Sequence, residues 1–264
     1  MIETFFNLRA TPFAKDIRPA DLLDTQPRTE LLARLEHLRK HHGIFLLTGA
    51  PGTGKTTALR GWVDALPETS HKVVYLPLTI ISPYDLYVCL NDELGGQPAH
   101  RKSKVFSNLQ SAILDSVATT RRLPVIIFDD AHYLPNKTLV ELPMLLNFQM
   151  DSFDPVMVVL SGHERLSARL RSPLLRHLDQ RISLRHEMPA LDEDATRAYV
   201  DHRLRLVGAS ADLFEAAAIL AVHKVAKGTH RLVDRFATDS LTLAALDKRD
   251  RVTEEDVYNA SKAI

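Results

Sequence analysis

The chain has a single cysteine, Cys89, among its 264 residues, so an internal disulfide is excluded. This fits a reducing compartment such as the cytoplasm. Cys89 lies between the apolar residues Val88 and Leu90, which favours buried packing over a reactive role. The sequence also lacks the spacing that is typical of zinc ligands or of a Ser-His-Asp site.

Net charge is absent as well, because 33 Lys and Arg residues balance 33 Asp and Glu residues. The overall charge therefore gives no footprint of nucleic acid or membrane, and a nucleic-acid role would need a local basic patch. No stretch approaches the ~20 apolar residues of a membrane helix. Glu3, Asn7 and Arg9 interrupt any signal-peptide-like run at the start. We expect a cytoplasmic protein with no membrane partner.

One glycine-rich stretch fits the P-loop pattern G-x-x-x-x-G-K-[ST] at every required position. An apolar run over 44–48 precedes it, which predicts a buried strand, and a helical pattern begins at Thr56-Thr57. Its glycines let backbone N–H groups turn around phosphate oxygens at the helix N-terminus. We expect Lys55 to reach the β- and γ-phosphates of ATP, and the Thr56 hydroxyl to bind Mg²⁺. The predicted nucleotide-binding residues are Gly49, Ala50, Pro51, Gly52, Thr53, Gly54, Lys55, Thr56 and Thr57.

A second acidic element follows the apolar run 125–128, which ends in Asp129 and Asp130. This is the Walker B arrangement, in which Asp129 would hold Mg²⁺ at the carboxyl end of its strand. Asp130 stands where a hydrolytic ATPase usually carries Glu to orient and deprotonate water. Its side chain is one methylene shorter, which leaves normal turnover, slow turnover and an ATP-bound resting state open. Without the P-loop, two acids after a strand would indicate only a solvated strand end.

Five further polar residues are candidates for the remaining roles at the predicted site. Ser161 or His163, after the apolar run 156–160, is a candidate for sensing the γ-phosphate or the attacking water; a simple polar turn is the alternative. Arg176 or Arg181 is a candidate for stabilising transition-state charge in a neighbouring subunit, against ordinary surface ion pairing. Arg231 follows Gly228-Thr229-His230 and is positioned to report nucleotide state from a C-terminal helical region.

Apolar strands alternate with helices up to Pro189, which predicts an α/β domain with a five-stranded parallel sheet covered on both faces. Only helical periodicity follows. We therefore predict an α/β nucleotide-binding domain at 1–189 and a small all-helical lid at 190–264. Within the first, residues 1–28 are expected to be irregular, and Thr29 to cap the next helix. Four apolar residues of this segment are expected to pack on the main body: Phe5, Phe6, Leu8 and Phe13.

The order and spacing of these elements resemble an AAA+ ATPase over about residues 28–264. Short motifs narrow the resemblance to the ExeA-like group, which includes the secretion-associated ExeA/GspA proteins and the TnsC/TniB-type ATPases of transposons. The motifs are Phe6-x-Leu8-x-x-x-Pro12-Phe13, Asp129-Asp130-Ala131-His132, Leu160-Ser161-Gly162-His163-Glu164-x-Leu166, Gln180-Arg181-Ile182 and Gly228-x-x-Arg231. These relatives usually carry Asp-Glu at Walker B, so Asp130 is a departure.

Resemblance to the transposition ATPases implies assembly of copies into a ring or helical filament on double-stranded DNA, with ATP. It also implies recruitment and activation of a transposase, with a target-selection protein as a further partner. Secretion-associated members generally add a membrane span and a periplasmic domain, and we expect neither here. A local basic cluster with one acid, Asp115, gives modest support for DNA phosphate contacts. It consists of Arg101, Lys102, Lys104, Arg121 and Arg122.

Two other functions remain open. The first is an ExeA/GspA-like ATPase that acts on a secretion or other protein assembly without DNA, which DNA-independent assembly would favour. The second is a scaffold that binds ATP and hardly hydrolyses it, for which Asp130 is the support. No aromatic residues alternate with the basic cluster, as they would in a platform that stacks single-stranded bases.

Overall fold

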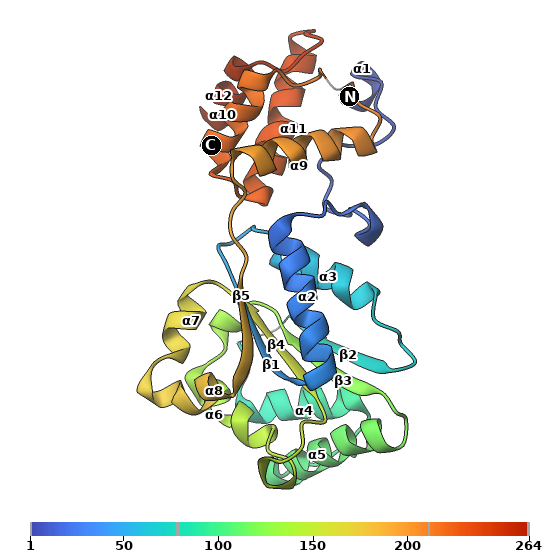
Figure 1. The fold of residues 1–264 in the computed structure, drawn as a ribbon, viewed down its shortest axis with the longest axis vertical. Coiled ribbons are helices and arrows are strands. Elements are labelled where there is room, and N and C mark those ends of the chain that lie inside the picture. Colours follow the sequence, from blue (N-terminus) through green and yellow to red (C-terminus); the bar gives the residue numbers. More distant parts are fainter. Residues whose placement is uncertain (1, 78–79, 211, 263–264) are drawn as a thin grey trace. The chain divides into compact units, whose positions relative to one another are not determined.

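The computed structural model describes residues 2–77, 80–210 and 212–262. The chain divides into two compact units, and each is described by itself (Figure 1). The α/β unit comprises Arg28–Gly49 and Lys55–Met188. The helical unit comprises Met1–Pro27, Ala50–Gly54 and Pro189–Ile264.

The α/β unit is built on a five-stranded sheet in the order β2-β3-β4-β1-β5, with every neighbouring pair parallel. The predicted parallel sheet is thus confirmed. Because Thr48 pairs with Gly162 and Leu76 with Phe128, the loops that follow the strands leave one edge together, and ligands of open α/β sheets bind at this edge. The strands are β1 (Gly43–Thr48), β2 (His71–Leu76), β3 (Leu123–Phe128), β4 (Met157–Gly162) and β5 (Ile182–Glu187).

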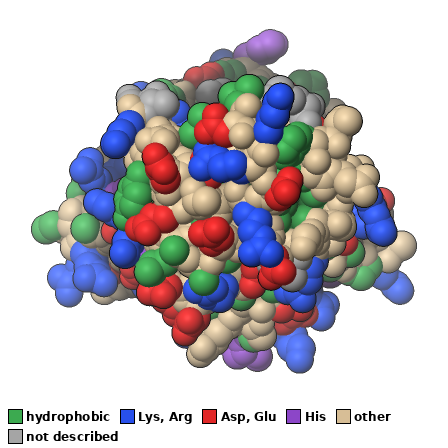
Figure 2. Space-filling model, turned by 90° about the horizontal axis from the view of Figure 1, so that it is seen from above, with side chains coloured by type: hydrophobic (Ala, Val, Ile, Leu, Met, Phe, Trp, Pro, Cys, Tyr) green, Lys and Arg blue, Asp and Glu red, His purple; other side chains and the backbone are tan. Residues whose placement is uncertain are grey.

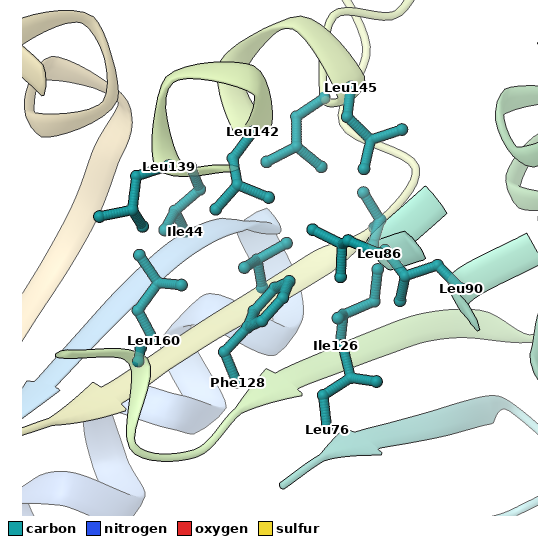
Figure 3. Close-up of a cluster of buried hydrophobic side chains, with 14 of the residues drawn as sticks. Ile44, Leu76, Leu86, Leu90, Ile126, Phe128, Leu139, Leu142, Leu145 and Leu160 are labelled. Atoms are coloured by element: carbon teal, nitrogen blue, oxygen red, sulfur yellow. The ribbon is translucent and has the colours of Figure 1, made fainter. Parts of the chain in front are cut away.

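Alternate residues of β1 to β4 enter two separate cores, since successive side chains point to opposite faces. Ile44 and Leu46 of β1 pack with α4, α5 and α6, whereas Phe45 and Leu47 pack with α2 and α3. Each fully buried side chain of this size stabilises the fold by about 1.5–3 kcal/mol. Figure 3 shows the first core, where leucines of α4 and α6 lie over the strands: Leu86, Leu90, Leu139, Leu142 and Leu145 above Ile44, Leu76, Ile126, Phe128 and Leu160.

Seven α-helices cover this sheet in the described ranges: α2 (Gln26–His41), α3 (Lys55–Asp64), α4 (Pro83–Leu94), α5 (Lys102–Ala118), α6 (Asn136–Leu145), α7 (Arg165–Leu170) and α8 (Arg176–Arg181). Three 3₁₀ turns join them: η2 (Ala131–Tyr133), η3 (Gln149–Asp151) and η4 (Pro173–Leu175). Ser82 caps α4 by accepting from the Asp85 N–H, and Gly95 ends it in a left-handed conformation. Thr29 is no cap, because α2 begins three residues earlier at Gln26.

The helical unit packs four helices around its own core: α9 (Glu193–Leu206), α10 (Ala216–Ala226), α11 (His230–Leu246) and α12 (Glu254–Lys262). Asp192 caps α9 by accepting from the Ala195 N–H at 2.7 Å. The first turn of α12 contains three acids, Glu254, Glu255 and Asp256. Their negative charges interact favourably with the positive end of the helix dipole. One β-bridge, between Phe214 and Val252, accompanies the helices.

The N-terminal segment, with α1 (Ile2–Phe5) and η1 (Pro19–Asp21), belongs to this helical core. The prediction that its apolar residues pack on the α/β body is wrong, because Leu8 and Phe13 are buried in the helical unit and Phe6 packs there too. Backbone contacts explain the placement. The Arg9 N–H donates to the Val207 carbonyl at 2.9 Å, and Arg203 donates to the Ala14 carbonyl at 2.7 Å. Residues 1–27 therefore group with Pro189–Ile264, unlike in the predicted 1–189 domain.

Candidate nucleotide site

The P-loop has the backbone that its glycines predict. Gly52 and Gly54 adopt φ angles of 81° and 90°, which side-chain-bearing residues rarely do. Lys55 opens α3, and its largely buried Nζ donates to the Gly49 carbonyl at 2.9 Å. The amino group is thus held at the Gly49 carbonyl, and Lys55 stands at the N-terminus of a helix, where anions bind.

Asp129 lies directly after β3 and accepts three hydrogen bonds. Thr56 Oγ1 donates to its Oδ2 at 2.7 Å, and the Tyr75 hydroxyl donates to the same oxygen at 2.9 Å. The Asp130 N–H donates to Oδ1 at 3.1 Å. The predicted metal ligands Thr56 and Asp129 are therefore neighbours, with the carboxylate orientation fixed from two sides.

Tyr75 is a residue that the sequence analysis missed. It lies on the edge strand β2, paired with Ile127 of β3, and 48% of the residue is exposed. Burial of the rest and the hydrogen bond to Asp129 raise the pKa of Tyr75 to about 12, so the phenol remains a proton donor. An aromatic residue next to the end of a strand was the available signal. Its contact with Asp129 depends on strand order, which local patterns do not give.

Asp130 occupies an unusual backbone position at the start of the turn η2. Its φ of 51° and ψ of 36° lie in the left-handed region, which aspartate tolerates better than most residues. Its side chain is 64% exposed, and Oδ1 is 3.9 Å from His132 Nδ1. The carboxylate of Asp130 is thus accessible to solvent beside the buried Asp129.

The tip of β4 lies against this turn. The His163 N–H donates to His132 Nδ1 at 3.3 Å, and the Arg165 N–H donates to His163 Nδ1 at 3.2 Å. Both rings therefore carry their proton on Nε2 when these bonds form. Burial lowers the pKa of His132. Of the two sensor candidates, His163 is half-buried, whereas Ser161 is fully buried and its Oγ bonds to none of the described residues.

The two candidate arginines differ in their surroundings. Arg181 forms an ion pair with Asp151 and donates to the Pro143 carbonyl at 3.0 Å, so its own subunit engages it. Arg176 is exposed at the start of α8, and no ion pair of its guanidinium is seen within the described ranges.

Arg169 of α7, which precedes Arg176 and Arg181 in the chain, has a different arrangement. It donates to Asn136 Oδ1 at 2.8 Å, to the His132 carbonyl at 2.9 Å and to the Leu134 carbonyl. Burial lowers the pKa of its guanidinium. Local sequence patterns could not indicate these contacts, because they join residues that are 33 to 37 positions apart.

In the helical unit, the start of α11 lies against the P-loop residues of that unit. The Arg231 N–H donates to the Gly52 carbonyl at 3.3 Å. A Cβ on Gly52 would lie 2.9 Å from both Arg231 Cβ and Thr229 Cγ2. The sequence-predicted Arg231 is exposed and thus lies next to the loop that it was predicted to report on.

A buried polar network supports this end of α11. The Tyr199 hydroxyl donates to Asp234 Oδ1 at 2.8 Å, and Arg203 donates to the same hydroxyl at 2.8 Å. Arg203 also lies 3.6 Å from Asp234 Oδ1. The His230 ring meets the Tyr199 ring edge-on at 5.0 Å. Burial raises the pKa of Asp234 to about 6, and burial together with nearby Arg203 lowers the pKa of His230 to about 4.

The predicted basic cluster is not one surface. Arg101 and Lys104 lie at the start of α5, and Arg121 and Arg122 lie beyond its other end, so the 17-residue helix separates them by about 25 Å. Lys102 pairs with Glu141, and Arg122 donates to the His71 carbonyl at 3.1 and 3.3 Å. Figure 2 draws the molecule from above the view of Figure 1, not from the side of α5, and on the face that it draws the described acidic and basic side chains are interspersed.

A family model described as an AAA domain matches residues 37–170, just over half of the chain. The chain belongs to this AAA domain family. It is an AAA+ ATPase with a nucleotide-binding P-loop, as the resemblance implied. The matched range contains the P-loop, Asp129 and Asp130, the tip of β4 and Arg169.

General secretion pathway protein A from Aeromonas hydrophila is 30% identical to this AAA ATPase over 266 residues. The match covers 99% of this chain but 48% of the relative, so the chain spans about half of the relative's length. This finding supports membership of the ExeA-like group. The resemblance to TnsC/TniB proteins stays a prediction.

Solved structures share the fold. Cdc6p from Pyrobaculum aerophilum superposes with a TM-score of 0.73 at 17% identity, covering 96% of this chain and 70% of that one. Drosophila ORC bound to DNA gives a TM-score of 0.69 at 22% identity, covering 94% of this chain and 63% of that one.

Among the residues that the structure describes, every helix is too short or too polar to span a membrane.

Proposed function

We propose that this AAA ATPase binds ATP with Mg²⁺ and uses hydrolysis to control assembly with its own copies. The hydrogen bond between Thr56 and Asp129 carries the proposal, because it joins the P-loop helix to the Walker B strand at the predicted metal position. Lys55 contacts the β- and γ-phosphates, and the loop amides bind the remaining phosphate oxygens.

The oxygen donors fit magnesium. Mg²⁺ takes octahedral oxygen ligands at about 2.1 Å, so adjacent ligands lie about 3 Å apart. Thr56 Oγ1 and Asp129 Oδ2 are 2.7 Å apart and need only a small adjustment. A bound Mg²⁺ would supply charge neutralisation at the phosphates.

Asp130 is the proposed acceptor of the water proton, because its carboxylate is exposed beside Asp129 and its nearest cationic partner among the described residues, His132 Nδ1, is 3.9 Å away. His163 is the better placed sensor, with an Nε2–H available for a phosphate oxygen. Arg176 is the better candidate to act in a neighbouring subunit, since Arg181 is engaged by Asp151. Arg231 is proposed to report nucleotide state from the helical unit.

We infer two alternatives for what the assembly acts on. The first is double-stranded DNA with recruitment of a transposase and a target-selection protein. The motif resemblance and three exposed basic residues, Arg101, Lys104 and Arg121, favour it. In this case binding depends on phosphate contacts and weakens steeply with salt.

The second alternative is a secretion or other protein assembly, without DNA. The 30% identical relative favours it by its name. The ion pair of Lys102 and the backbone contacts of Arg122 also favour it, since they leave fewer cations for phosphate. The ATP-bound scaffold is a variant of either alternative in which Asp130 supports little turnover.

One experiment separates these alternatives. The chain is mixed with labelled duplex DNA and ATP, ADP or a non-hydrolysable analogue across a salt series, while particle size and phosphate release are followed. ATP-dependent, salt-sensitive binding with large assemblies supports the DNA function, and Arg101→Ala with Lys104→Ala should then weaken it. Assembly without DNA affinity at low salt contradicts that function. Assembly without phosphate release indicates the scaffold.

A further inference from the structure

The turn after Walker B has no regular secondary structure beyond η2, yet one side chain from another element holds it. The guanidinium of Arg169, on α7, donates hydrogen bonds to three acceptors in this turn: the His132 and Leu134 carbonyls and Asn136 Oδ1. A planar guanidinium with several fixed donors suits such a set, whereas a lysine ammonium is a point donor on a flexible stem. The arrangement fixes the path of residues 132–136.

The same turn sets the direction of Asp130. Asp130 has left-handed backbone angles. The direction of its side chain therefore depends on the path of the residues that follow it. The turn closes through the Tyr133 N–H to the Asp130 carbonyl at 2.9 Å and the Leu134 N–H to the Ala131 carbonyl at 3.1 Å. The donors of both bonds, Tyr133 and Leu134, lie inside the segment that Arg169 holds, and their acceptors, Asp130 and Ala131, come directly before it.

Arg169 also ties this turn to the tip of β4. It lies on α7, which begins three residues after Gly162. A Cβ on Gly162 would lie 3.1 Å from the His132 nitrogen, so the strand tip and the turn are in close contact. The β4 tip, which carries the sensor candidate His163, and the turn that begins at Asp130 thus pack against each other.

We propose that Arg169 is a positioning residue for Asp130, which it orients through the turn 131–136 and couples to the β4 tip. The inference rests on the proposed role of Asp130 in hydrolysis. Arg169 touches neither nucleotide nor water in this role.

The test compares Arg169→Lys with Arg171→Lys, a matched change at the exposed end of the same helix. Arg169→Lys should lower the kcat for ATP hydrolysis by about tenfold or more and leave the Kd for an ATP analogue within about twofold. Arg171→Lys should change neither. Equal loss in kcat and analogue affinity, or an unchanged kcat, would overturn the proposal.

A double-mutant cycle shows whether Arg169 acts through Asp130. In an Asp130→Ala background, Arg169→Lys should cause no further loss of the residual rate. Independent, multiplicative losses would show that Arg169 acts elsewhere and overturn the proposal.

A third measurement needs no hydrolysis. Hydrogen exchange of the Tyr133 and Leu134 amides in the nucleotide-free chain should speed up on the order of tenfold in Arg169→Lys and stay unchanged in Arg171→Lys. Unchanged exchange in both variants overturns the proposal. If the wild-type chain fails to hydrolyse ATP, the proposed function fails, and the exchange result still decides whether Arg169 holds the turn.

Discussion

Each unit of the molecule contains an aspartate that accepts a hydrogen bond from a tyrosine hydroxyl, and the two pairs are used differently. Tyr75 and Asp129 lie at the carboxyl edge of the sheet, where Tyr75 is half-exposed. Tyr199 and Asp234 lie inside the helical unit, where Tyr199 is 8% exposed. The same pair thus orients the predicted metal-binding carboxylate at an open edge and joins α9 to α11 in a closed core.

The largest expected effect is at the open edge. Lys55→Met removes the cation held above the P-loop, and ATP turnover should fall on the order of 10³-fold, because the charge that develops on the phosphates loses its partner. The change is checked by phosphate release and by binding of a fluorescent ATP analogue. Lys40→Met, on the exposed end of α2, is the control. Turnover within about threefold of wild type would contradict the assignment.

Asp130→Asn comes next, with an expected loss in kcat on the order of 10²-fold, typical of a removed general base. Analogue affinity should stay close to that of wild type, since Asp130 lies outside the phosphate loop. Asp130→Glu restores the acid that ATPases of this kind usually carry and should match or exceed wild-type turnover. If Asp130→Asn keeps full turnover, another residue activates the water.

Asp234 of the closed pair and the neighbouring His230 make the stability of the helical unit respond to pH in two opposing ways. The pKa of His230 is lowered to about 4 from its ordinary 6.5, so its stabilisation is full above pH 6.5 and is lost as pH falls through 4. The pKa of Asp234 is raised to about 6 from 3.8, so its stabilisation is full below pH 3.8 and is lost as pH rises through 6.

When the pH falls from 7 to 5, the lowered pKa of His230 should therefore decrease the free energy of unfolding by about 2 kcal/mol. The raised pKa of Asp234 should increase it by about 1 kcal/mol over the same range. Relative to wild type, His230→Gln should gain stability on acidification, whereas Asp234→Asn should lose more. Urea unfolding of the three proteins at both pH values measures this. Parallel pH profiles for all three would refute the assigned directions.

The smallest effect separates the two tyrosines directly. Tyr75→Phe should raise the Mg²⁺ concentration needed for half-maximal analogue binding about tenfold, as loss of a partner that orients a metal ligand does, with little change in unfolding. Tyr199→Phe should lower the free energy of unfolding by about 1–2 kcal/mol without changing the Mg²⁺ requirement. The comparison fails if the two variants show the same pair of changes.

Much of the sheet could be predicted, because fully buried parallel strands are short apolar runs that stand out between helices. Their ends could not. β5 continues to Glu187 through Arg185 and His186, since backbone pairing with β1 holds residues that are polar. The strand order is also non-local, so the contact of Tyr75 with Asp129 had no signal in either local sequence.

At the site, motif spacing predicted Lys55, Thr56 and Asp129 as neighbours, because a P-loop and an acidic strand end leave few other arrangements. It did not distinguish among arginines. Arg169, Arg176 and Arg181 look alike in sequence, and only the acceptors around each one separate them. The core in which the N-terminal phenylalanines pack could not be predicted either, since apolar character alone does not indicate which of several cores a side chain enters.

Gly52 meets two unrelated requirements at once. Its backbone angle alone disfavours a side chain, and Arg231 and Thr229 leave no space for one. Glycine is therefore required at this position by two independent constraints, one on the backbone angle and one on space. In a library that randomises the loop and is screened for folding alone, without nucleotide, Gly52 should tolerate fewer alternatives than Gly54, whose nearest neighbour, His230, is 3.9 Å from the place of a Cβ. Sequence variation in the loop would then record the presence of the helix beside it.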